Sequence, residues 1–185
     1  MFKLLRNRLA LSTVVTTLII LVVAVLLATV VVYYATNVVG TRVQEESLHL
    51  TKHHIWYDAN VGASQAAIMI INTGGRDVVI DKITCRGQES AWTNVYYNVT
   101  TNAISADLEY QLTLANGTSI AIGSTSYTFS QASTDVLLKS GQTMLLYVAS
   151  PDSISVNDVG LTVSTTLFTA QAMYHREANV EAVTL

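Results

Sequence analysis

The sequence predicts an α+β fold, in which a long N-terminal hydrophobic helix precedes an all-β domain of the immunoglobulin-like sandwich type. Two observations lead to this prediction. Residues 9–41 form a run without a charged side chain, and from about residue 61 onward apolar and polar residues alternate in short runs. A long apolar run favours a helix in apolar surroundings, whereas alternation favours half-buried strands. The expected parts are a basic leader over residues 1–10, a helix over 11–58 and a β-sandwich over 59–185.

Charge is distributed unevenly along the chain. Lys3, Arg6 and Arg8 precede the apolar run, and the other 7 of the 10 Lys and Arg residues stand against 13 Asp and Glu, so the rest of the chain carries −6. The positive-inside rule predicts that the basic end stays in the cytoplasm and the C-terminal part lies outside. Beyond the first ten residues we find no basic cluster, so no nucleic-acid partner is expected. Cys85 is the single cysteine, which excludes an internal disulfide and predicts a small buried side chain.

The apolar run is longer than a membrane anchor needs. As a helix its 33 residues would extend roughly 50 Å, whereas a bilayer core is about 30 Å thick. The run also exceeds the roughly 7–15 apolar residues of a secretory signal peptide. From Thr41 to Asp58 the sequence contains neither Gly nor Pro. Val43, Leu48 and Ile55 are spaced as on an amphipathic helix. We therefore expect the helix to continue to Asp58.

Three details of the run bear on its surroundings. Thr16 and Thr17 lie one turn after other hydroxyl residues, so their hydroxyls can bond back to backbone carbonyls or cross to a neighbouring helix. Ala24 and Ala28 form one small-xxx-small pair, which is a weak signal for close helix packing. Tyr33 and the tyrosine after it fall where an interfacial aromatic belt would lie.

The remainder predicts seven to nine short strands of a β-sandwich. Asn116-Gly117 is the strongest hairpin signal, and Ser140-Gly141 marks a similar turn. The less patterned stretch from Gln88 to Asp107 is expected to be a long loop. The expected strand pairs are 64–72 with 76–85, the two halves of 110–123, the two halves of 135–149, and 159–168 with 169–183.

Two Asn-X-Thr sequons, at Asn98 and Asn116, lie in or beside expected turns. If the domain is exported, both asparagines are candidate sites of N-glycosylation. The pattern is short and arises easily in a chain rich in Thr and Asn. The topology that places the basic end inside the cell places both sequons outside, which strengthens the prediction that they are glycosylated.

The sequence contains no pattern typical of catalysis or metal binding. Adjacent His53 and His54 would point to different sides of a helix, with no further ligand at a useful spacing. Asp152 and Asp158 could offer oxygens to Ca²⁺, and an Asx-rich turn explains them equally well. No GxSxG, P-loop or GxGxxG motif occurs. We therefore expect neither an enzyme nor a bound metal or cofactor.

The order of segments resembles the archaeal type IV pilin and archaellin-like family, whose precursors carry a class III signal peptide. The resemblance is carried by the basic leader MFKLLRNRLA, the run LSTVVTTLIILVVAVLLATVVVYYATNVV and the Thr-rich β-part. Within that part, IMIINTGGRDVVIDKITCRG resembles the start of the family's globular domain, and residues 139–182 resemble its closing strands.

The resemblance implies that a prepilin peptidase in the membrane removes the leader. The expected cut lies between Ala10 and Leu11. In the family a basic residue is followed directly by Gly or Ala, whereas here Leu9 separates Arg8 from Ala10. A cut near Leu9, or no cut, are the alternatives.

The resemblance further implies a helical homopolymer, built by the type IV pilus assembly machinery and acting in surface adhesion. The helices would leave the membrane and form the filament core, with the β-domains outside. The residues expected to pack in that core are Val14, Leu18, Leu21, Val25, Ala28 and Val32. Alternatives are an archaellum subunit for motility, a membrane-anchored extracellular binding module that does not polymerise, and, least supported, a tethered hydrolase.

Overall fold

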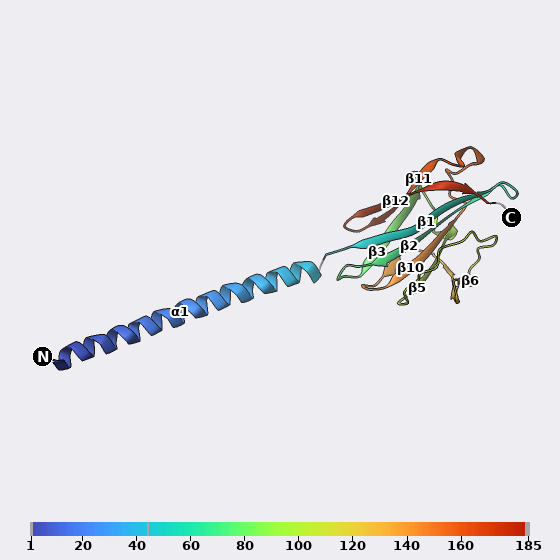
Figure 1. Cartoon of the computed structure of the whole chain (residues 1–185). Coiled ribbons are helices and arrows are strands. Elements are labelled where there is room, and N and C mark those ends of the chain that lie inside the picture. The colour runs from blue at the N-terminus through green and yellow to red at the C-terminus, as the bar shows by residue number, and fades with distance from the viewer. Residues whose placement is uncertain (1, 44, 184–185) are drawn as a thin grey trace. The chain divides into compact units, whose positions relative to one another are not determined.

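The structure is a computed structural model that describes the backbone of residues 2–43 and 45–183 and the side chains of residues 12–41 and 45–183. Two compact units follow one another along the chain (Figure 1), and the first of them ends at Val43. The first unit is the helix α1, Phe2–Val43. The second is a domain made mostly of strands, so the predicted fold class is confirmed.

Across its described residues, 45–183, the β-domain contains twelve strands and two short 3₁₀ helices. The strands are β1 Leu48–Asp58, β2 Ala63–Asn72, β3 Val78–Cys85, β4 Gln88–Glu89, β5 Val95–Thr100, β6 Ser119–Ile122, β7 Thr125–Thr128, β8 Ser130–Gln131, β9 Val136–Leu138, β10 Thr143–Ala149, β11 Thr162–Thr169 and β12 Met173–Ala182; the 3₁₀ helices are η1 Trp92–Asn94 and η2 Val156–Asp158.

The main sheet has the strand order β4-β3-β11-β12-β1-β2-β10-β5-β8, with β9 beside β3. β1 and β12 pair in parallel at residues 55–57 and 180–182, whereas the other described pairs are antiparallel. This parallel pair joins the β1-β2-β10-β5-β8 half to the β4-β3-β11-β12 half. The sheet curls, and both halves contribute apolar residues to one core.

β2 and β10 are buried on both of their faces, because the domain has two apolar clusters. Alternate residues such as Ile68 and Leu146 enter the core between the two halves of the sheet. Their neighbours Met69 and Tyr147 enter a second cluster, which residues between Ile104 and Phe129 complete. This irregular segment and its β6–β7 hairpin therefore cover the face of the sheet that would otherwise be wet.

The prediction that the helix continues to Asp58 is wrong. α1 ends at Val43, and residues 48–58 form β1, which pairs with β2 along its length. β1 has a bulge between Thr51 and His54, where Lys52 adopts φ 50°. Leu48 faces the main core before the bulge and Ile55 faces it afterwards. The one extra residue in the bulge reverses which residues of β1 face the core. The alternation typical of a strand is therefore interrupted in the sequence, and the spacing of apolar residues resembles that of a helix.

The expected strand pairs were only partly right. β11 and β12 pair as predicted. β2 and β3, like β9 and β10, are consecutive in sequence but belong to different halves of the sheet, so their turns connect the two halves. Asn116-Gly117 forms a turn, but the hairpin that follows is β6–β7, which turns at Gly123. Residues 88–107 contain β4, η1 and β5 besides the loop, because β5 pairs with β10.

Candidate functional site

The described side chains of α1 present an apolar surface without a partner. Ser12–Thr41 have a mean hydropathy of 3.1, and none of this segment is buried. Its large apolar side chains are between 40% and 71% exposed, on every side of the helix. A helix that is apolar all round belongs in surroundings that are apolar all round. α1 is therefore long and apolar enough to cross a membrane.

The six residues predicted to pack in a filament core lie along one side of α1, because their spacing alternates between three and four. Val25, Ala28 and Val32 of this set border a shallow groove above the small Ala28 side chain, together with Thr29, Tyr33 and Thr36. Val14, Leu18 and Leu21 are about as exposed as their neighbours on the other sides. The packing role of this set remains a prediction.

Five threonine hydroxyls of α1 bond to carbonyls within the helix. Thr16 Oγ1 donates to the Ser12 carbonyl at 2.9 Å, and Thr29 Oγ1 donates to the Val25 carbonyl at 2.8 Å. Thr17, Thr36 and Thr41 make similar bonds to carbonyls three or four residues earlier. Of the two alternatives that the sequence left open for Thr16 and Thr17, the structure shows the bond within the helix. The helix can therefore enter an apolar environment without leaving these hydroxyls unpaired.

The predicted cleavage site lies in the first turns of α1. Ala10 and Leu11 have helical backbone, and their side chains lie outside the described ones. Cleavage there remains a prediction.

The two sequons differ in the state of the amide nitrogen that would carry a glycan. Asn98 lies within β5, and its Nδ2 donates to the Thr128 carbonyl at 2.7 Å. Asn116 is exposed in the turn before β6, and its Oδ1 accepts from the Gln131 N–H at 3.0 Å. Among the described contacts its Nδ2 makes no hydrogen bond. Asn116 is thus the sequon whose acceptor atom is available.

Of the histidines and acidic residues singled out from the sequence, His53, His54 and Asp158 are engaged in structural contacts, whereas Asp152 is exposed. His54 stacks on Trp56, and its Nε2 lies 3.0 Å from Asp107 Oδ1. His53 is buried and its Nε2 lies 2.9 Å from Thr165 Oγ1. Asp158 forms an ion pair with Arg86 at 2.6 Å, so its carboxylate is not free for Ca²⁺. Within the described residues, no group of three His, Cys, Asp or Glu is placed to hold a metal.

His53 is the most perturbed of these groups. Burial lowers the pKa of His53 from 6.5 to about 4, although the Glu177 backbone favours the protonated ring, and nearby His54 and Arg176 lower the pKa further. The ring shares its partner Thr165 with Cys85, whose Sγ is 3.6 Å from Thr165 Oγ1. Cys85 is 1% exposed, which confirms the prediction that it is buried, and burial raises its pKa. The neutral imidazole therefore serves the packing of the core.

Two structural contacts had no sequence signal. The Lys52 ammonium at the bulge donates to the carbonyls of Ser105 at 2.6 Å, Ile104 at 3.2 Å and Ala106, and so holds the segment that covers the second cluster. Arg86 holds the β10–β11 loop through Asp158. Both contacts join residues more than 50 positions apart, so only the fold reveals them.

Comparisons with known proteins establish no family. No family model matches the chain, and no curated protein sequence matches it. A β-glucosidase from Erythrobacter marinus aligns in structure with 73% of this chain and 15% of its own, at 10% identity and a TM-score of 0.28. The ligand-binding region of serine-glutamate repeat protein A from Enterococcus faecium aligns over 76% and 99%, at 13% identity and a TM-score of 0.27. At these scores neither likeness shows a shared fold.

Proposed function

We propose that the chain is a structural subunit of an extracellular filament of the archaeal type IV pilus kind, which acts in surface attachment. The helices α1 pack together in the filament core, and the β-domains lie outside. Before assembly α1 lies in the cytoplasmic membrane, with the basic leader inside and the β-domain outside.

The observation that carries this proposal is the surface of α1. Ser12–Thr41 span roughly 45 Å as a helix, about 15 Å more than a bilayer core requires. This whole length is apolar on every side, so it needs apolar contact all round. Lipid supplies such contact only within the bilayer, whereas several neighbouring helices supply it along the full length.

The β-domain supports the same arrangement because it is complete without the helix. Both apolar clusters are built from residues 48–183. The helix is therefore free to exchange lipid for other helices while the domain stays folded. A contact between different surfaces, repeated by a helical symmetry, produces an open filament instead of a closed ring.

Electron microscopy of filaments sheared from cells tests the proposal, combined with mass spectrometry of the subunit. We expect this chain in the filaments, with Leu11 as its first residue after removal of the leader by a prepilin peptidase. A filament subunit that retains its leader would contradict the predicted cleavage but not the proposed polymer.

Finding the chain only in detergent-extracted membranes would overturn the polymer proposal and favour the non-polymerising anchored module. Deletion of the gene separates attachment from motility. A strain that still swims but no longer attaches supports attachment, whereas a strain that loses swimming supports the archaellum alternative.

A further inference from the structure

The β-domain concentrates exposed apolar side chains at one end. We call the loop end the combination of the β1–β2 loop (residues 59–62), residues 107–112 and the β10–β11 loop (residues 150–161). Five of the eight large apolar side chains that are exposed on the described β-domain lie there. They are Val61, Leu112, Val156, Val159 and Leu161, with exposures between 39% and 64%.

The three segments of the loop end meet at the start of β2. Gln65 exchanges two hydrogen bonds with the backbone of Gln111, at 2.9 and 3.0 Å. The Ser150 N–H donates to the Ser64 carbonyl at 2.8 Å, and Ser64 Oγ donates to the Pro151 carbonyl. The β1–β2 loop and the β10–β11 loop lie at the same end of the domain in Figure 1. The three segments that carry the exposed apolar side chains are therefore neighbours at one end of the domain.

The β10–β11 loop is held in one conformation. Arg86 donates to Asp158 and to the Ser153 carbonyl, and Ser155 donates to Asp158 through both its N–H and its Oγ. These bonds, of which the one from Arg86 has the largest effect, lower the pKa of Asp158 to about 2. Asp158 is therefore ionised at neutral pH and keeps its bonds to Arg86 and Ser155. Within this loop Ile154 is buried while Val156, Val159 and Leu161 point outward. A rigid loop that presents apolar side chains loses little conformational entropy on binding.

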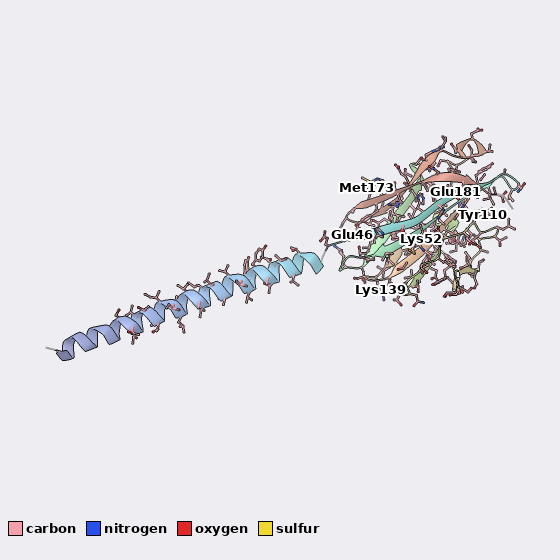
Figure 2. The ribbon with its side chains drawn as sticks, viewed as in Figure 1. Glu46, Lys52, Tyr110, Lys139, Met173 and Glu181 are labelled. Carbon is pink, nitrogen blue, oxygen red and sulfur yellow. The ribbon has the colours of Figure 1, made fainter. Side chains whose placement is uncertain are left out.

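The charge of the loop end is acidic. Asp107, Glu109 and Asp152 are exposed there, and Glu181 on β12, labelled in Figure 2, is exposed beside His54. His54 contacts both Asp107 and Glu181, and the guanidinium of Arg86 is already bound to Asp158. The ammonium of Lys52 lies near Asp107, but it is bound to the carbonyls of residues 104–106. Two copies meeting through their loop ends would bring like charges together, which is unfavourable.

We propose that the loop end is a docking surface for a partner protein whose contact face combines apolar side chains with Lys or Arg. The apolar residues supply the buried centre of the contact, and the surrounding carboxylates supply complementary charge. This inference deepens the attachment role of the proposed function by naming the surface that attaches. It requires the folded domain and does not require polymerisation.

The test uses the full-length protein held in lipid nanodiscs by α1, so that the result is independent of filament formation. The probes are beads that carry both phenyl and amine groups, beads with phenyl groups alone and beads with amine groups alone. Empty nanodiscs correct for binding of lipid. The key variant is Val156→Ser/Val159→Ser/Leu161→Ser, and the matched control is Val79→Ser/Leu137→Ser, an exposed apolar cross-strand pair on β3 and β9.

We expect the mixed beads to retain the wild type most strongly, and added salt to weaken retention. The loop variant should bind about tenfold more weakly, whereas the control variant should bind like the wild type. Circular dichroism checks that both variants are folded. Equal retention of the loop variant and wild type would overturn the proposal. Retention on the phenyl beads that is as strong as on the mixed beads and independent of salt would also overturn the proposal. Formation of dimers of the nanodisc-held protein through their loop ends would overturn it as well.

Discussion

At the scale of single residues, the polar groups that looked chemically active in the sequence are used to build the fold. His53 is the clearest case, because it occupies the core and shares its partner Thr165 with Cys85. An imidazole in such a site is stable only when neutral, since burial penalises the charge. Its effect is therefore on stability and on the dependence of stability on pH.

We predict that His53 makes the β-domain acid-sensitive. The unfolded chain binds a proton at His53 near pH 6.5, whereas the folded domain binds it only near pH 4. Stability is therefore complete above pH 6.5, falls as the pH drops from 6.5 to 4, and changes no further below 4 on account of this group. The total loss is about 3 kcal/mol. Unfolding at several pH values, followed by the fluorescence of buried Trp56, measures it.

The variant His53→Gln should lose most of this slope between pH 6.5 and 4. His175→Gln, at an exposed position of β12, is the control and should keep it. If His53→Gln and the wild type show the same dependence on pH, the role assigned to His53 is wrong.

At the scale of single elements, β1 depends on its bulge. The bulge turns Lys52 toward the carbonyls of residues 104–106 on the segment that covers the second apolar cluster. A charged donor that binds several carbonyls stabilises a segment that has no strand partners of its own.

We predict that Lys52→Ala loosens residues 104–112 and leaves the rest of the domain folded. The expected loss of stability is about 1–3 kcal/mol, because the carbonyls lose a charged donor. Hydrogen exchange measured by mass spectrometry should rise in peptides covering this segment. Lys139→Ala, in the exposed turn before β10, is the control. Unchanged exchange in residues 104–112 of Lys52→Ala would show that the contact has no such role.

The helix α1 is apolar along its length, so a single charge should prevent its packing. We predict that Val22→Asp blocks filament assembly, because an unpaired carboxylate among packed helices costs several kcal/mol. Val22→Thr is the matched control, since threonines such as Thr16 and Thr29 bond to the backbone of their own helix. We expect filaments from Val22→Thr and none from Val22→Asp in electron micrographs. Normal filaments from Val22→Asp would contradict a helical core.

At the scale of the whole molecule, the chain joins two units that require different surroundings. The helix requires apolar surroundings, whereas the β-domain has its own core and an acidic, polar surface. The proposed export of the domain would expose its sequons to glycosylation, and the fold would decide which of them is usable.

We predict that Asn116 carries a glycan and Asn98 does not. Among the described contacts the nitrogen to be modified makes no hydrogen bond at Asn116, whereas at Asn98 it donates to the Thr128 carbonyl. Peptide mass spectrometry of the protein from its native cells should show a mass shift that disappears in Asn116→Gln. A glycan on Asn98 in folded protein would show that this hydrogen bond does not protect the site.

Composition and periodicity alone were enough to predict the fold class, the apolar helix and the final pair of strands. The helix was predictable because a run of 33 residues without a charged side chain favours a helix in apolar surroundings. The β11–β12 pair was predictable because its contacts are between neighbours in sequence. The burial of Cys85 was predictable because an unpaired cysteine is usually a small buried side chain.

The end of the helix and the pairing of most strands were decided by tertiary structure. A one-residue bulge in β1 removed the alternation that would have identified the strand. The pairs β2–β10, β3–β11 and β3–β9 join distant parts of the chain. The same holds for Lys52, Arg86 and the loop end, whose contacts join segments 46 or more residues apart. Periodicity reports on the burial of one segment, whereas pairing and surface chemistry depend on which segments the fold brings together.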